Sequence, residues 1–170
     1  MKFSFNRTMA LLVISSAFFL AATSCKKSNS SSNGSTQLSA TVGGNSFQPN
    51  AAAGIYSTSD GLFELAAYEI KSGDTTGMAI YFDAPLPSQM NLPISSDTAY
   101  VDVQYTDSKS GFTYDGGQIA GHSLLTVTAW DSVHLKVTGT FSGVVYNIVN
   151  GSDSLIVTNG QFSTAYTVTP

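Results

Sequence analysis

Apolar and polar residues alternate along several short segments of the chain. In the clearest case, Val133, Leu135, Val137 and Phe141 share one parity, and polar residues occupy most of the other. A two-residue period is typical of a strand that buries one face and exposes the other. The same alternation recurs in 78–82, 101–105 and 161–168. No helical period stands out, so the pattern predicts an all-β chain.

Gly, Asn, Asp and Ser separate these runs, as expected of turns. The predicted strands are 38–42, 45–48, 52–58, 62–70, 76–83, 98–106, 111–115, 122–130, 133–147, 153–158 and 161–168. Consecutive short strands with tight turns predict an antiparallel meander that closes as a β-sandwich, with an up-and-down barrel as the alternative. Three prolines lie in 84–96, and proline cannot donate to a ladder, so this segment is a predicted loop or crossover.

Two turns can be predicted in detail. Asn159-Gly160 is a strong signal for a type I′ hairpin, which would separate the last two strands. A three-residue loop at 131–133 keeps the apolar residues of the two neighbouring strands on one face, and a one-residue slip would mix the faces. This register predicts Trp130 on the polar face, opposite His134 and beside Lys136.

The N-terminus carries targeting signals. Lys2 and Arg7 precede a mainly apolar stretch, 9–22, that is too short to span a membrane. Ala22-Thr23-Ser24-Cys25 resembles a bacterial lipobox, although Ala22 stands where leucine is usual. The resemblance implies a lipoprotein signal peptide at 1–24 and lipid attachment at Cys25. The alternative is ordinary secretion with a free thiol.

Residues 25–36 contain the proposed lipidated cysteine and a Ser/Asn-rich segment with no apolar residue after Cys25. Such a composition is typical of a flexible tether. Residues 37–170 form one predicted domain. We therefore expect a protein of the cell envelope, anchored by lipid, most plausibly to the outer membrane and facing either the periplasm or the surface.

Composition excludes several classes of function. Seven Lys and Arg against eleven Asp and Glu give a formal net charge of -4, without the basic surface of a nucleic-acid-binding protein. One Cys and two His leave no basis for a disulfide scaffold or a His/Cys-rich metal site. The sequence indicates no cofactor and no metal.

The sequence also contains no recognisable set of catalytic residues. Glu64 and Glu69 are an odd number of residues apart, so a regular strand would point them to opposite faces. Asp97, Asp102 and Asp107 fit turn and solvent-facing positions. We expect no enzymatic activity. Asp107, Asp115 and the carbonyls around Gly116-Gly117 are hard oxygen donors, which could form a calcium site. The alternative is that these acids are simply solvated loop residues.

Two surface features could bind or carry carbohydrate. Trp130 with His134 and Lys136 could stack on a sugar ring or clamp a peptide, because Trp is enriched where binding energy concentrates; Trp130 could instead cover the edge of the core. Asp-Ser/Thr tripeptides resemble the O-glycosylation acceptors of one group of Gram-negative bacteria. Their hydroxyl-bearing residues are Thr75, Thr98, Ser132 and Ser154.

The C-terminal third resembles small all-β envelope lipoproteins that have no assigned activity. The motifs are Val137 to Gly143, which contains Gly-Thr-Phe, and Ile156 to Phe162, which contains Asn-Gly-Gln-Phe; an early match is Ala40 to Phe47. The resemblance implies an all-β fold and a location in the cell envelope. The expected function is a non-enzymatic binding or adhesion module for glycan or peptide. A structural subunit of an envelope complex is the alternative, and a hydrolase is less favoured.

Overall fold

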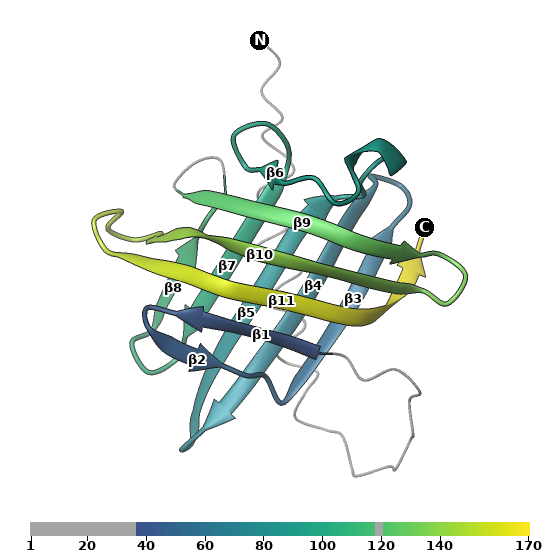
Figure 1. Ribbon diagram of the computed structural model, residues 1–170. Coiled ribbons are helices and arrows are strands. Elements are labelled where there is room, and N and C mark those ends of the chain that lie inside the picture. The colour runs from purple at the N-terminus through teal and green to yellow at the C-terminus, as the bar shows by residue number, and fades with distance from the viewer. Residues whose placement is uncertain (1–36, 118–120) are drawn as a thin grey trace. The chain divides into compact units, whose positions relative to one another are not determined.

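The computed structural model describes residues 37–117 and 121–170, which form strands almost throughout (Figure 1). The strands are β1 (Gln37–Val42), β2 (Asn45–Phe47), β3 (Ala51–Ser57), β4 (Leu62–Lys71), β5 (Asp74–Asp83), β6 (Ile94–Ser95), β7 (Val101–Asp107), β8 (Phe112–Asp115), β9 (His122–Asp131), β10 (Lys136–Asn147) and β11 (Ser154–Thr169). A 3-10 turn, η2 (Pro87–Gln89), lies in the proline-rich segment between β5 and β6. That segment is the predicted loop.

The strands form two layers that cross in Figure 1, a front layer of β1, β9, β10 and β11 and a back layer of β3, β4, β5, β7 and β8. Hydrogen-bonded pairs join the layers at two corners, where β11 meets β3 and β10 meets β8. The predicted all-β class is therefore confirmed: the strands form one mixed sheet, and the β10–β11 pairing closes it on itself in a sandwich- or barrel-like arrangement.

One corner departs from the predicted antiparallel meander. The end of β11, Tyr166–Thr169, pairs in parallel with Gly54–Ser57 of β3. A Cβ atom at Gly54 would lie 3.0 Å from Cβ of Tyr166 and 2.9 Å from the Phe63 ring. Glycine thus permits the close approach of two strands that are far apart in sequence, which no local turn signal encodes.

The core lies between the layers and follows the predicted alternation. The largest fully buried side chains include Phe63, Ile80, Phe82, Val103, Val127, Val137 and Phe162, drawn from both layers. Residues between them in sequence point to the outer faces. Burial of these apolar surfaces is the main favourable contribution to folding.

Glycine and phenylalanine face each other reciprocally on β10 and β11. Gly139 is opposite Phe162, and Phe141 is opposite Gly160. A Cβ at Gly139 would lie 2.6 Å from the Phe162 ring, and one at Gly160 would lie 2.7 Å from the Phe141 ring. Each ring therefore covers the glycine across from it. This pairing gives the Gly-Thr-Phe and Asn-Gly-Gln-Phe motifs a packing role.

The predicted hairpin at Asn159-Gly160 is wrong. β11 runs without interruption from Ser154 to Thr169, and β10 and β1 pair with it on both sides of this dipeptide. Asn159 has a φ of 53°, and the register shifts there. Asparagine tolerates the left-handed conformation, and here that conformation forms a β-bulge. The bulge bends the strand without ending it.

The predicted register of the β9–β10 hairpin is also wrong. Asp131 pairs with Lys136 and Trp130 pairs with Val137, so the turn spans residues 132–135. Val133 is 83% exposed, and Leu135 has a φ of 49°. A second shift, between Thr138 and Gly139, inserts one extra residue into β9. The bulge changes the parity, which places Trp130 on the core side of the sheet.

Candidate functional site: a polar groove and a buried acid pair

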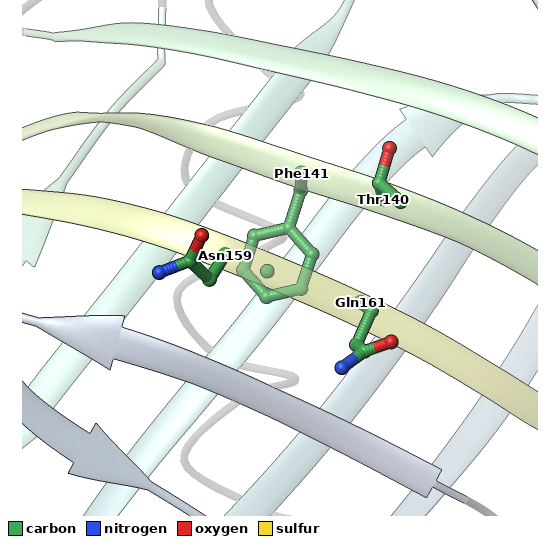
Figure 2. Close-up of a pocket in the computed structure, with 5 residues that line it drawn as sticks. Thr140, Phe141, Asn159 and Gln161 are labelled. Carbon is green, nitrogen blue, oxygen red and sulfur yellow. The ribbon is translucent and has the colours of Figure 1, made fainter.

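A groove of ≈ 630 Å³ crosses the outer side of the front layer from β9 to β1 and the segment after β2. Its lining contains no charged side chain. The lining residues are Gln37, Leu38, Ser39, Gln48, Pro49, Thr128, Thr138, Gly139, Thr140, Gln161, Phe162 and Ser163. A second hollow of ≈ 400 Å³ shares Thr140 and Gln161 with it. Figure 2 shows Phe141 beside this hollow, reaching across β11 between Asn159 and Gln161.

The groove lies along a row of polar side chains from four strands, of which Ser39, Thr140 and Gln161 line it. Ser39 is opposite Gln161, Gln161 is opposite Thr140, and Thr140 is opposite Thr126. With about 4.8 Å between strands, the row is roughly 14 Å long. Within the described ranges, the side chains of Ser39, Thr140 and Gln161 make no hydrogen bond. Their hydroxyl and amide groups are therefore free to bond a ligand.

Trp130 is not part of this surface. It packs against four aromatic rings, with centroid distances of 5.5 Å to Tyr56, 5.6 Å to Phe63, 6.5 Å to Phe82 and 5.4 Å to Tyr166. These neighbours belong to both layers. Trp130 therefore joins the layers at the corner where β11 meets β3, and the prediction that it lies on the polar face is wrong.

His134 and Lys136 lie away from the Trp130 ring. His134 is in the exposed β9–β10 turn, where its Nδ1 is 2.7 Å from Oδ2 of Asp131. Lys136 is exposed and pairs with Asp131, one position out of phase with the inward-facing pair of Trp130 and Val137. Alternate residues point to opposite faces of a strand. The structure therefore does not bring the three predicted binding residues together.

The two histidines are also separate. His122 is at the start of β9, with its Nδ1 3.0 Å from Oδ2 of Asp97, whereas His134 follows the end of the same strand. Each histidine has its own carboxylate partner. Both side chains are exposed. The two histidines therefore have separate partners and lie near opposite ends of β9.

Three of the predicted O-glycosylation residues are exposed. Thr98 lies between β6 and β7, Ser132 lies in the β9–β10 turn, and Ser154 begins β11. Thr75 is half-buried within β5, next to the β4–β5 turn. The hydroxyl of Thr98 donates to the carbonyl of Ser95 at 3.2 Å. An enzyme would reach Ser132 and Ser154 most easily. Glycosylation itself stays a prediction.

The outer side of the back layer has a different chemistry. Cross-strand pairs connect Glu64 to Tyr81 and Tyr81 to Asp102, and Gln104 lies opposite Asp115. These residues alternate with core residues such as Phe82 and Val103, so their side chains face away from the core. Glu64 and Glu69 point to opposite faces of β4, as expected from their spacing.

Asp102 is not the solvent-facing residue that its position in a strand predicted. It is only 6% exposed. The amide nitrogen of Gln104 donates to Oδ2 of Asp102 at 2.9 Å and reaches Oδ2 of Asp115 at 3.4 Å. Oδ1 of Asp102 has no hydrogen-bond partner. Sequence reasoning missed this pair because the register of β7 and β8 brings it together.

Burial shifts the ionisation of this face. Desolvation, helped by the nearby charge of Asp115, raises the pKa of Asp102 to about 7. Desolvation also raises the pKa of Asp115, although the Gly117 N–H and Gln104 oppose it. The pKa of Tyr81 is raised by desolvation first and then by the charge of Glu64. Among the described residues, the causes of these shifts include no cation, so burial favours the protonated, neutral form of these acids.

Comparison with protein-family models, curated proteins and solved structures returned no match. Across residues 37–117 and 121–170, no helix has the length and hydrophobicity needed to cross a membrane, and no three His, Cys, Asp or Glu side chains gather as a metal cluster. The signal peptide, Cys25 and the tether lie outside the described residues.

Proposed function

We propose that this is a lipid-anchored protein of the bacterial cell envelope whose folded domain is a non-enzymatic module that binds a neutral glycan in the front-layer groove. The sequence at Cys25 supports the anchor. The observation that carries the ligand assignment is the uncharged lining of the groove, which includes Ser39, Thr140 and Gln161.

The groove suits a ligand rich in hydroxyl groups. Hydroxyl and amide side chains act as both donors and acceptors, which matches the chemistry of sugars. A charged polymer would find no ion-pair partner in a lining without Lys, Arg, Asp or Glu. With Trp130 turned inward, recognition depends on hydrogen bonds. We therefore expect weak binding to each sugar unit and higher affinity for longer chains.

A binding assay with soluble oligosaccharides tests the assignment. The full chain, purified in detergent, is titrated with cellohexaose and maltohexaose as neutral probes and with an alginate oligomer as the charged probe. The double variant Thr140→Val/Gln161→Ala should weaken binding of a neutral probe at least tenfold. Thr158→Val is the matched control, since Thr158 lies on β11 outside the groove lining.

Two results would contradict the glycan assignment. One is binding of the charged probe alone, and the other is equal binding by the wild type and the groove variant. A failure of all three probes in the wild type would remove the ligand class proposed here. Unchanged unfolding curves for the variant would show that a loss of binding is local.

The anchor needs its own experiment. Metabolic labelling with radioactive palmitate should modify the wild type and leave Cys25→Ser unlabelled. Protease added to intact cells, with lysed cells as the control, then reports orientation: digestion before lysis places the domain outside, and survival until lysis places it in the periplasm. Survival would exclude a surface adhesin and favour a periplasmic partner.

A structural subunit is the second candidate, because apolar side chains are exposed at loop tips. Val133 in the β9–β10 turn is 83% exposed, and Val149 in the β10–β11 turn is 79% exposed. These turns lie at opposite ends of β10, so they do not form one patch. Crosslinking in intact cells should capture a discrete partner if this candidate is correct. Charged substitutions at Val133 and Val149 should then abolish the crosslink.

A further inference from the structure

Asparagine precedes glycine at two places in the described part of the chain, and the two places differ in their surroundings. Asn150-Gly151 lies in the turn between β10 and β11, whereas Asn159-Gly160 lies within β11. Glycine has no side chain to shield its backbone nitrogen, so this nitrogen can attack the amide carbon of the asparagine before it. Both asparagines are exposed. Exposure of the asparagine alone therefore does not distinguish the two dipeptides.

The turn holds the side chain of Asn150 in a position that favours this attack. Oδ1 of Asn150 accepts the backbone N–H of Ser152 at 3.1 Å and that of Asp153 at 3.2 Å. Two N–H donors on one carbonyl oxygen stabilise the negative charge that develops there when a nucleophile adds to the carbon. The N–H of Gly151 bonds to the carbonyl of Asn147 at 2.8 Å. Only this bond has to open, and hydrogen bonds in exposed turns open at low cost in free energy.

The surroundings of Asn159-Gly160 oppose the same reaction. β1 and β10 pair with β11 on both sides of this dipeptide. Gly160 is buried, unlike the exposed Gly151, and the carbonyl oxygen and ring of Phe141 lie directly over it. Its nitrogen cannot approach the Asn159 side chain unless the sheet opens. Pairs in the centre of a sheet open at a free energy that approaches that of global unfolding.

We propose that Asn150 is a site of spontaneous deamidation in the folded protein and that the sheet protects Asn159 from the same reaction. The backbone nitrogen of Gly151 forms a bond to Cγ of Asn150. The bond from Cγ to Nδ2 breaks, and Nδ2 leaves as ammonia with the proton that Gly151 gives up, so that a five-membered succinimide remains. Water then opens the ring at either of its two carbonyl groups. The product at position 150 is aspartate or isoaspartate, and water is the only co-reactant.

The aspartate product is compatible with the turn. A carboxylate at position 150 can accept the same N–H groups of Ser152 and Asp153, and a charged acceptor forms stronger hydrogen bonds than a neutral one. The isoaspartate product adds a methylene group to the backbone and changes the spacing of the turn. Each product adds a negative charge beside Asp153. Because the turn is not part of the groove lining, this inference does not depend on the glycan assignment.

Peptide mapping by mass spectrometry tests the proposal on the full chain in detergent. The protein is incubated at 37 °C and pH 7.4, once folded and once in urea, and the deamidated fraction is followed at Asn150 and at Asn159. In urea the two asparagines should react at similar rates, because both precede glycine and the fold is gone. In the folded protein, the rate at Asn150 should stay within about threefold of its value in urea, and the rate at Asn159 should fall at least tenfold.

Gly151→Asp is the matched variant. Aspartate tolerates the positive φ of 61° at this position, and its side chain shields the backbone nitrogen. The variant should deamidate at Asn150 at least tenfold more slowly, with an unchanged rate at Asn159. Equal rates at the two asparagines in the folded protein, faster reaction at Asn159, or an unchanged rate at Asn150 in the variant would each overturn the proposal.

Asn150→Asp reproduces one product and tests whether the turn accepts it. The variant should unfold in urea at the same concentration as the wild type or at a higher one, because the turn keeps its hydrogen bonds. A clear loss of stability would contradict the argument that aspartate is compatible with the turn.

Discussion

The two outer faces of the sandwich are built on the same core but differ in chemistry. The front layer presents uncharged hydroxyl and amide groups in a groove, whereas the back layer holds Glu64, Asp102 and Asp115 with no nearby cation. Neutral hydroxyl and amide groups can exchange their hydrogen bonds to water for hydrogen bonds to a ligand at little cost in free energy. Burial makes the charged form of the back-layer carboxylates costly, and protonation removes that cost. The comparison shows that one core can support two outer faces that differ in charge and burial.

Trp130→Ala should have the largest effect on stability, because it removes a side chain that packs the two layers together. Replacing a packed Trp by Ala costs about 3–5 kcal/mol, and this ring contacts aromatic residues from both layers. Urea denaturation should show the loss, and the glycan response should weaken with it. Trp130→Phe is the milder control. A variant with wild-type stability would show that Trp130 contributes little to the packing of the layers.

Gly160→Ala should affect the front face and spare the back face. The new Cβ would collide with the carbonyl oxygen and ring of Phe141, and such overpacking costs about 1–3 kcal/mol. Because Gly160 and Gln161 line the hollows of the front layer, glycan affinity should fall as well. Urea denaturation and glycan titration measure the two losses. Wild-type stability together with wild-type glycan affinity would contradict this prediction.

Glu64→Gln should have the smallest effect and should touch only the back face. Burial raises the pKa of Glu64 above its ordinary value of 4.5, against the opposing hydrogen bond from Tyr81. The folded state therefore holds this proton more tightly than the unfolded state. The resulting stability is complete below about pH 4.5 and is lost as the pH rises through the raised pKa.

Urea denaturation between pH 4 and pH 8, with a chelator present, measures this contribution. The wild type should lose stability over the range just above pH 4.5, and Glu64→Gln should show a shallower slope there. Glu69→Gln is the control, because Glu69 lies on the other face of β4 and accepts the Gln48 N–H. Parallel curves for the wild type and Glu64→Gln would contradict the argument.

The sequence predicted the parts of the fold that depend on local alternation. Met78, Ile80, Phe82, Val101 and Val103 all face the core, as their parity required. The turn signal at Asn159-Gly160 marks a bulge instead of a hairpin, and the parity argument failed at Trp130 because a bulge in β9 changes the parity. A bulge forms where the partner strand continues past an extra residue, and the identity of that partner is not a local property.

By itself, the sequence determined the all-β class and the strand faces away from bulges. Only the tertiary structure decided the parallel pairing of β11 with β3, the inward position of Trp130 and the two candidate sites. Ser39, Thr126, Thr140 and Gln161 come from four strands, and Asp102 meets Asp115 through the register of β7 and β8. Alternation encodes which side of a strand a residue takes. Which strands become neighbours depends on packing the whole core.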